Sequence, residues 1–386
     1  MYFTFTILRK EVLFMIITNG LVFTEENTFK KKDLYIHNHQ LVNSPSELTD
    51  SEKTNLLDAN GLMILPGLID LHIHGCAGYD FCDGSHEGLV TMAKHLKAHG
   101  ITSFCPTTMT VSKQSLETIC ASINYIQSNE ESKILGINME GPFVSAKKKG
   151  AQSVEHIATA DINLFDSLNS LSNNQVKLIT IAPEEPNALS FIHQLHAANP
   201  DIIISLGHTV ASYETAMIAL ESGASHITHL YNAMMPFSHR EPGLIGAALD
   251  SYNTTVELIC DGYHIHPSVI RATFTMFGAG RVILVSDNMR ASGMSDGKYT
   301  LGGQDVYVKE RKATLLDGTL AGSVTNLFDC MKRAISFGIS VEDAINAATK
   351  NPAKKLGVYD SIGSIAIGKQ ADLLLVDSDF NLVKVL

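Results

Sequence analysis

The sequence predicts an α/β protein: a (β/α)8 TIM-type barrel with a small β-sandwich domain formed by the N- and C-terminal segments. Between residues 67 and about 290, short apolar segments alternate with helical stretches, which is typical of βαβ units and a parallel sheet. The apolar segments begin near residues 67, 101, 134, 176, 202, 225, 254 and 281, which makes eight strands. They are rich in β-branched and aliphatic residues, as expected for strands that are buried on both faces.

Both ends of the chain show a different pattern. Residues 15 to 62 give short strands separated by turn signals, and short strands return after Ser295 at 299–301, 305–308 and 371–377. A helical pair near 323–337 and 341–349 lies between them. We therefore predict a sandwich domain from 15–65 and 296–386, and a catalytic barrel from 66–295 with barrel helices allowed to extend to about residue 350. The first fourteen residues are expected to precede the native start and to do little.

Composition limits the class of protein. The chain has 386 residues, of which 45% are hydrophobic, so it can bury a sizeable core. Its net charge of −11 argues against a nucleic-acid partner and against an anionic membrane surface. The six cysteines show no CxxC spacing, which suits reduced thiols in a cytoplasmic enzyme. The apolar N-terminal stretch is too short to span a membrane, and Arg9-Lys10-Glu11 interrupts it.

Residues 66–75 (PGLIDLHIHG) form the most informative segment. His72 and His74 are two residues apart on a buried strand, so both side chains share one face. An isolated pair of this kind is more often two packed core histidines than a metal site. Other strand-like segments, however, also end in metal-ligand residue types, and the carboxyl ends of barrel strands meet at one mouth. These end residues are Glu140, His208, His229 and Asp287. Such a set suits a divalent metal, zinc or iron.

The sequence motifs of this chain resemble those of the amidohydrolase superfamily, and within it the N-acetylglucosamine-6-phosphate deacetylase family. The resemblance runs from about Met15 to the C-terminus. The PGxIDxHxHG pattern alone indicates only the superfamily, whereas the combination of the EGPF, HLYNAM, REPG and DGYH motifs is specific to the deacetylases. The matching segments are PGLIDLHIHG (66–75), MEGPF (139–143), GHT (207–209), THLYNAM (228–234), REPG (240–243), DGYH (261–264), SDN (286–288) and LAGS (320–323).

The resemblance implies an enzyme that hydrolyses N-acetyl-D-glucosamine 6-phosphate to D-glucosamine 6-phosphate and acetate in amino-sugar catabolism. It implies a metal-dependent barrel with a β-sandwich domain, and a homodimer. Glu140, His208 and His229 match the main metal site, and His72 and His74 match a second metal position, so one or two ions are expected. Asp287 matches the catalytic acid/base, although alone it could equally form an Asx turn with Asn288.

The resemblance also implies a substrate pocket. Asn232 and Ala233 match positions that hold the sugar phosphate, and Arg240 matches an arginine contributed by the partner subunit. Gln152 departs from the family pattern, in which this position is often histidine. The run Lys147-Lys148-Lys149 could contact the phosphate, but a run of this kind is more typical of a solvated loop. The remaining matched positions are Ala151, Asp261, Gly262, Tyr263, His264, Leu320, Ala321 and Gly322.

Two alternative functions remain open from the sequence. A different amidohydrolase, acting on a galactosamine 6-phosphate or a cyclic amide, would share the barrel and the metal ligands. A noncatalytic barrel used for binding or assembly would have lost some of the ligand positions, and none is missing in this chain. The sequence does not report the stereochemistry at C4 of the sugar.

Overall fold

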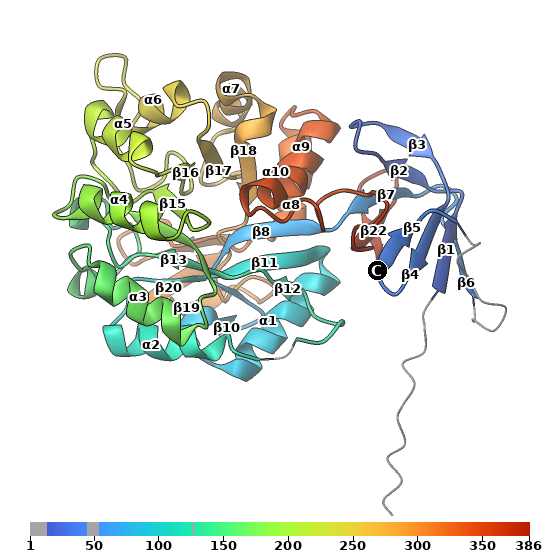
Figure 1. Cartoon of the computed structure of the whole chain (residues 1–386), viewed down its shortest axis with the longest axis horizontal. Coiled ribbons are helices and arrows are strands. Elements are labelled where there is room, and N and C mark those ends of the chain that lie inside the picture. Colours follow the sequence, from blue (N-terminus) through green and yellow to red (C-terminus); the bar gives the residue numbers. More distant parts are fainter. Residues whose placement is uncertain (1–13, 45–53, 126) are drawn as a thin grey trace, which may run out of the picture. The chain divides into compact units, whose positions relative to one another are not determined.

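Figure 1 shows the chain as a computed structural model that describes residues 14–44, 54–125 and 127–386. The chain divides into two compact units. The larger unit is Gly67–Tyr359, and the smaller unit combines the segments before Gly67 and after Tyr359. Of the fourteen residues expected to precede the native start, residues 1–13 lie outside the described residues. The fourteenth, Phe14, does not fit that expectation, because it opens strand β1 and is buried.

The larger unit is a (β/α)8 barrel, as predicted. Its parallel sheet follows the chain from β8 to β18, with β8 beside β11. The barrel strands are β8 (Leu68–Ile73), β11 (Ile101–Thr108), β12 (Lys133–Ile134), β13 (Ile137–Glu140), β14 (Val176–Ile181), β15 (Ile203–Leu206), β16 (His226–Ile227), β17 (Thr255–Ile259) and β18 (Val282–Val285). β12 and β13 pair one after the other with β11 and together take one of the eight positions. The first and last strands meet because His74 N donates to Asn288 O over 2.8 Å and Asp287 N donates to His72 O over 2.9 Å. The barrel therefore closes at the level of the predicted ligands.

Helices follow the strands around the barrel (Figure 1). They are α1 (His86–Ala98), α2 (Lys113–Ser122), α3 (Ile162–Leu171), α4 (Ala188–Ala198), α5 (Tyr213–Glu221), α6 (Gly243–Asp250), α7 (Pro267–Phe277), α8 (Leu327–Ser336), α9 (Val341–Ala348) and α10 (Lys350–Lys355). Helix α1 illustrates why they form: the Ser85 side chain accepts from Gly88 N at its start, and Leu89, Met92 and Leu96 bury one face. Two short strands, β9 (Gly75–Cys76) and β10 (Tyr79–Asp80), form a small antiparallel sheet. The short 3-10 helices are η2 (Phe81–Asp83), η3 (Ala146–Lys148), η4 (Val154–His156) and η5 (Ala279–Arg281).

The structure corrects the predicted domain boundary at residue 296. Strands β19 (Gly297–Leu301), β20 (Gln304–Lys309) and β21 (Lys312–Thr314) form their own antiparallel sheet between β18 and α8. Their apolar side chains, such as Leu301 and Val306, join one buried cluster with Met109 and Met289 of the barrel. This insertion and α8 to α10 therefore belong to the larger unit, because their hydrophobic faces are covered by barrel residues.

The smaller unit contains two sheets. One has the strand order β5-β4-β1-β6 and the other β23-β22-β7-β2-β3. Side chains from both sheets, including Ile17, Leu34, Ile64 and Leu375, pack in one buried cluster, as the layers of a sandwich do. The strands are β1 (Phe14–Thr18), β2 (Leu21–Phe23), β3 (Phe29–Lys31), β4 (Leu34–His37), β5 (Gln40–Val42), β6 (Thr54–Asp58), β7 (Met63–Pro66), β22 (Leu373–Val376) and β23 (Leu382–Val385).

Candidate active site

The predicted metal ligands occupy equivalent places at the ends of the barrel strands. Glu140 is the last residue of β13, and His208 and His229 each lie two residues beyond β15 and β16. Asp287 lies two residues beyond β18 in the same way, while His74 directly follows β8. Because the strands are parallel, all five side chains reach the same mouth of the barrel.

Three of these residues have an unusual backbone conformation. The φ angles are 48° at His208, 28° at His229 and 49° at Asp287, all in the left-handed region that non-glycine residues rarely adopt. A conformation of this kind costs about 1–3 kcal/mol per residue and persists where the surroundings impose it, often at functional sites. The chain therefore turns sharply after each strand and presents these side chains at the barrel mouth.

Glu140, His208 and His229 form one tight cluster. Glu140 Oε1 lies 2.8 Å from His229 Nε2 and 3.0 Å from His208 Nε2, and the two imidazole nitrogens are 3.1 Å apart. Each of the three residues is at most 4% exposed. Two nitrogen ligands and one carboxylate oxygen thus converge, and a catalytic metal needs such a set with positions left for water and substrate.

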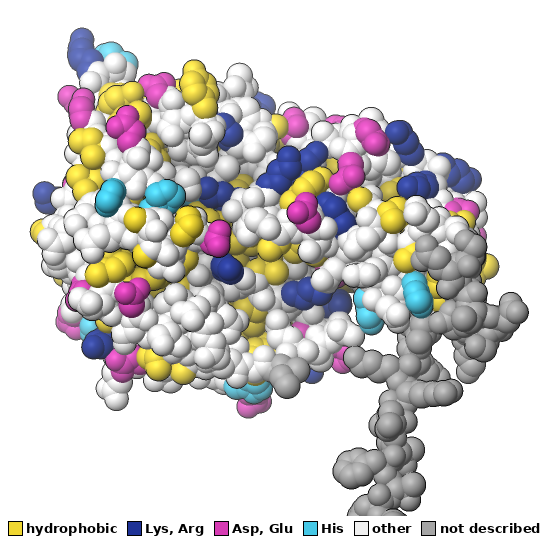
Figure 2. Space-filling view, in the orientation of Figure 1, with side chains coloured by type: hydrophobic (Ala, Val, Ile, Leu, Met, Phe, Trp, Pro, Cys, Tyr) yellow, Lys and Arg dark blue, Asp and Glu magenta, His cyan; other side chains and the backbone are white. Residues whose placement is uncertain are grey.

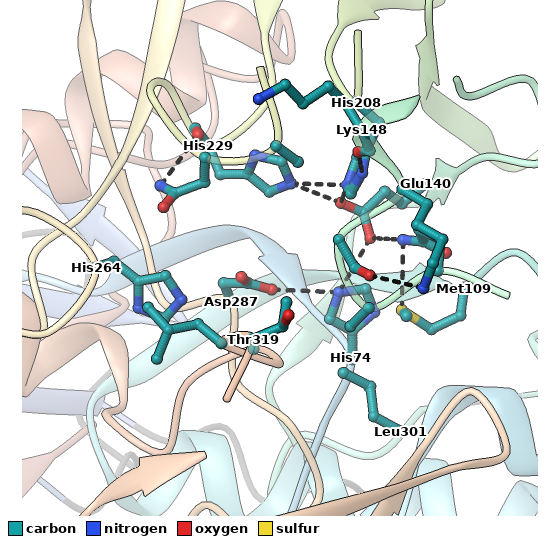
Figure 3. A pocket seen from close by; sticks show the side chains of 18 of the residues that line it. His74, Met109, Glu140, Lys148, His208, His229, His264, Asp287, Leu301 and Thr319 are labelled. Atoms are coloured by element: carbon teal, nitrogen blue, oxygen red, sulfur yellow. Dashed lines mark hydrogen bonds and ion pairs between the residues drawn. The ribbon is translucent and has the colours of Figure 1, made fainter. Parts of the chain in front are cut away.

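His72 and His74 form a second cluster that shares Glu140. Figure 3 shows His74 between Asp287 and Glu140. His74 Nε2 lies 3.3 Å from Glu140 Oε2, and His72 Nε2 lies 3.3 Å from His74 Nε2. Asp287 Oδ1 lies 3.2 Å from His74 Nε2 and 3.6 Å from His72 Nε2. Oε1 of Glu140 faces His208 and His229 and also lies 3.6 Å from His72 Nε2, while Oε2 faces His74. Glu140 therefore lies between the two clusters and contacts both.

The outer nitrogens of these rings are held by the backbone. His74 Nδ1 lies 3.2 Å from Thr107 O, and His208 Nδ1 lies 3.0 Å from Lys148 O. A carbonyl oxygen only accepts, so each Nδ1 carries a proton, and Nε2 is the nitrogen that faces the cluster and would bind a cation. Metal-binding histidines are oriented in this way. Among the described residues, His229 Nδ1 has no hydrogen-bond partner.

The electrostatics of the cluster keep both carboxylates ionised. Burial alone would raise the pKa of Glu140, but the imidazoles of His72 and His208 hold it well below its usual range. Burial would also raise the pKa of Asp287, and the hydrogen bond with His74 lowers it instead. Conversely, burial would lower the pKa of His74, whereas Asp287 and Glu140 raise it to about 9. An ionised Asp287 can accept a proton, and an ionised Glu140 can bind a cation.

A cavity of about 500 Å³ opens above the clusters. Lys148 and Lys149 are half-buried in its wall, whereas the sequence favoured a solvated loop for this segment. The loop adopts this position because its backbone bonds to His208 through Lys148 O. The cavity is lined by His74, Met109, Glu140, Ala146, Lys147, Lys148, Lys149, Gly150, Ala151, Gln152, His208, His229, Asn232, Ala233, His264, Asp287, Leu301, Asp317, Thr319, Leu320 and Gly322.

Gln152, the departure from the family pattern, is bonded directly to a candidate ligand. Its Nε2 donates to Glu140 Oε2 over 2.6 Å, and its Oε1 accepts from Thr110 N over 2.6 Å. The side chain is 1% exposed. Gln152 thus orients the carboxylate of Glu140.

Several residues expected in the pocket lie beside it instead. Asp261 is buried, and its Oδ2 lies 2.7 Å from His264 Nδ1, so it supports a wall residue. Tyr263 is 42% exposed, and its hydroxyl donates to Glu310 O. Ala321 is fully buried in the cluster that contains Met289. Gly262 does not line the cavity, and Arg240 is exposed and makes no ion pair with any described residue.

Sequence reasoning missed Glu257, which is 1% exposed in the middle of β17. Its Oε2 lies 2.9 Å from His72 Nδ1. A signal was present, because a carboxylate inside the apolar segment TVELI is costly to bury without a partner. Thr319 and Asp317 of the cavity wall had no comparable signal.

Comparisons with known proteins agree with this geometry. The amidohydrolase family model matches residues 63–386. The chain is 42% identical over 327 residues to the N-acetylglucosamine-6-phosphate deacetylase of Bacillus subtilis (strain 168), covering 83% of this chain and 82% of the relative. It is 32% identical over 329 residues to the N-acetylgalactosamine-6-phosphate deacetylase of Escherichia coli O157:H7, covering 84% and 86%.

A solved structure of a variant N-acetyl-D-glucosamine-6-phosphate deacetylase from Mycobacterium smegmatis, in complex with N-acetyl-D-glucosamine-6-phosphate, is also similar. Its TM-score is 0.87 at 28% identity, and the alignment covers 97% of this chain and 98% of that chain. The chain therefore belongs to the amidohydrolase family and, within it, to the N-acetylglucosamine-6-phosphate deacetylases.

Proposed function

We propose that the chain removes the acetyl group from N-acetyl-D-glucosamine 6-phosphate, giving D-glucosamine 6-phosphate and acetate in amino-sugar catabolism. The observation that carries this proposal is the cluster of Glu140, His208 and His229 with Asp287 at one cavity. Relatives with the same activity in their names support the choice of substrate. The proposed site residues all lie within Gly67–Tyr359, and we propose this unit as the catalytic domain.

The residues present fit a divalent metal ion, zinc or iron. Glu140, His208 and His229 would hold it, and His72 and His74 together with Glu140 would hold a second ion. The fit rests on two features of the site. The carboxylate and the imidazoles are buried, and the Nε2 atoms of the histidines face the cluster. Both zinc and iron accept nitrogen and carboxylate ligands of this kind. When bound, such an ion acidifies a water molecule and polarises the carbonyl oxygen of the substrate.

Asp287 is the proposed acid/base. It is ionised, and its carboxylate lines the cavity beside His74. We assign it to accept a proton from the attacking water and to return a proton to the departing nitrogen, because an amine anion is a poor leaving group. In the balanced reaction, the carbonyl carbon gains a bond to the water oxygen and loses its bond to nitrogen. The transferred proton ends on the amine of the sugar.

The sugar and its phosphate need polar and cationic groups from the cavity wall. His264 lines the cavity, and its Nδ1 is bonded to Asp261, so the other ring nitrogen remains for the sugar. Burial would lower the pKa of His264, but Asp261 raises it. Lys148 and Lys149 add positive charge in a protein whose net charge is −11. These groups support the binding of an anionic substrate.

Arg240 is proposed to act in the active site of a partner subunit. It is exposed and lies outside the cavity wall of its own chain. The same loop exposes Met235 and Phe237, which are 42% and 48% exposed, and apolar and arginine side chains of this kind are enriched at interfaces. A homodimer in which this loop reaches the second subunit would deliver a planar guanidinium to the phosphate.

We also propose a cytoplasmic enzyme with a small-molecule substrate. None of the six cysteines, all of which the structure describes, is paired in a disulfide, as expected in a reducing compartment. Figure 2 shows Lys and Arg interspersed with Asp and Glu on the face drawn, which is unlike the basic surface of a nucleic-acid-binding protein. Within the described residues, no helix combines the length and the apolar character needed to cross a membrane.

The test is a metal analysis of the purified protein combined with an assay for acetate release. The enzyme should retain at least one divalent ion per chain and should release acetate from N-acetyl-D-glucosamine 6-phosphate. Removing the ion with a chelator should abolish this activity, and adding zinc or iron should restore it. The galactosamine isomer is assayed in parallel, because one relative is named for it. Acetate release from neither sugar phosphate would contradict the proposed function.

A further inference from the structure

Glu257 is a buried carboxylate beside the two clusters of candidate metal ligands, and none of the proposed catalytic steps uses it. It lies in the middle of β17 and is 1% exposed. Both of its oxygens lie within hydrogen-bond distance of other groups, two of which are imidazole rings. A buried charge of this kind is kept only where it is paired and hydrogen-bonded.

The two oxygens of Glu257 contact three different groups. Oε2 lies 2.9 Å from His72 Nδ1 and accepts from the backbone N–H of His229 over 2.9 Å. Oε1 lies 3.2 Å from His226 Nε2. The carboxylate of β17 thus joins β8, which carries His72, to the segment that carries His229. These two histidines belong to different ligand clusters.

The contact with His72 determines which ring nitrogen faces the metal. Oε2 of Glu257 already accepts from the backbone N–H of His229, so it acts as an acceptor, and the proton in its contact with His72 lies on Nδ1. The other nitrogen, Nε2, then faces His74 and Glu140, at 3.3 Å and 3.6 Å, and is the one that would bind an ion. If the proton were on Nε2, the lone pair of Nδ1 would face Glu257 at 2.9 Å, which is repulsive.

We propose that Glu257 is a positioning residue. It fixes the tautomer and orientation of His72, which would then bind an ion at the second metal position together with His74 and Glu140. The proposal rests on the proposed metal-dependent function. Of the groups that hold the ring nitrogens of His72, His74 and His208, Glu257 is the only side chain, since the other two are main-chain carbonyls. It is therefore the one group of this set that a substitution can remove.

His226 provides the matched control. Its ring contacts Glu257 through Nε2 and Thr255 Oγ1 through Nδ1, at 3.2 Å and 2.7 Å, and it belongs to neither ligand cluster. A purely structural role for the network predicts similar effects of Glu257→Gln and His226→Gln. A positioning role predicts that only Glu257→Gln weakens metal binding. Glutamine keeps the volume of Glu257, and its oxygen can still accept hydrogen bonds, so this variant is the one expected to fold. The amide has no charge, however, and it can also turn an N–H donor toward His72, so it no longer holds the proton of His72 on Nδ1.

The experiment measures Zn²⁺ stoichiometry and affinity by competition with a chelator, without substrate, for the wild type and both variants. Glu257→Gln should weaken the binding of one ion by about 10- to 100-fold, the usual effect of removing an outer partner of a ligating histidine. His226→Gln should change it by less than about 3-fold. In a His74→Gln background, which removes the second position, Glu257→Gln should cause no comparable loss, because the coupling partner is gone.

Activity gives a separate readout. At saturating Zn²⁺, Glu257→Gln should regain most of the wild-type kcat with an unchanged KM, because the ligands and the substrate pocket are intact. Equal zinc affinities for the wild type and Glu257→Gln, or equal losses in Glu257→Gln and His226→Gln, would overturn the positioning role alone. A wild-type protein that binds no divalent ion would instead overturn the proposed function together with this inference.

Discussion

Replacing Gln152 by alanine should destabilise the metal-free barrel and disturb Glu140. The side chain is 1% exposed and bridges two elements. Its Oε1 accepts from the backbone N–H of Thr110 over 2.6 Å, and its Nε2 donates to Glu140 Oε2 over 2.6 Å. Alanine removes both bonds, and no other described side chain is bonded to Thr110 N.

The size of the effect follows from these two contacts. A buried N–H left without an acceptor costs about 1–3 kcal/mol, and a hydrogen bond to a charged group contributes about 1.5–3 kcal/mol. The two losses share one side chain and are not independent, so we expect about 3 kcal/mol in the free energy of unfolding rather than the full sum. Glu140 would also lose its orientation, and metal affinity should fall by about 10- to 100-fold.

Denaturant unfolding of the metal-free protein and a zinc competition titration measure the two effects. Gln194→Ala is the control, because Gln194 is exposed on α4 and donates only to Ser190 Oγ. It should change stability by less than about 0.5 kcal/mol. If Gln152→Ala lost no more stability than Gln194→Ala and bound zinc as the wild type does, the bridge between Thr110 and Glu140 would not hold Glu140 in place.

Three further predictions concern the proposed roles. Glu140→Ala or His208→Ala should lose both metal and activity, because either change leaves an incomplete ligand set. Normal turnover with stoichiometric metal in either variant would show that the replaced residue is not a metal ligand. Asp287→Asn should lower kcat by on the order of 10²-fold or more without loss of folding, and a near-normal kcat would exclude Asp287 from proton transfer. Arg240→Ala should lower kcat/KM for the phosphorylated sugar by roughly 10- to 200-fold, with little change for the unphosphorylated sugar. Mixing Arg240→Ala with Asp287→Asn subunits should restore some activity if Arg240 crosses the dimer interface; an unchanged phosphate preference would show that the phosphate is held elsewhere.

Much of the fold could be predicted because barrel strands buried on both faces have a distinct composition. Predicted starts at 101 and 176 match β11 and β14, and starts at 202 and 254 differ by one residue from β15 and β17. The ligands could be predicted for a related reason. Except for His72, which lies within β8, each is at or just beyond a strand end, where a polar residue after an apolar run is conspicuous.

The errors arose where tertiary packing decides the outcome. The strands of 297–314 alternate as any half-buried strand does, and their sequence does not indicate which surface will cover them. Leu301 and Val306 pack with Met109 of the barrel, so the segment became part of the larger unit. The lysines at 147–149 form a short basic run whose sequence does not indicate its position. In the structure this loop lies against the cavity, where Lys148 O bonds to His208 Nδ1 and Ser145 N bonds to His208 O.

The site therefore divides into groups that the sequence specifies and groups that only folding supplies. Ligand atoms belong to side chains, so their residue types are visible in the sequence. The groups that orient two of those ligands, Thr107 O and Lys148 O, are main-chain carbonyls, which any residue provides. Substituting the side chain of Lys148 should thus leave the orientation of His208 intact, whereas Glu257 acts on His72 through its side chain. Sequence reasoning alone can find an outer group only in the second case, and the signal is a charge where the strand should be apolar.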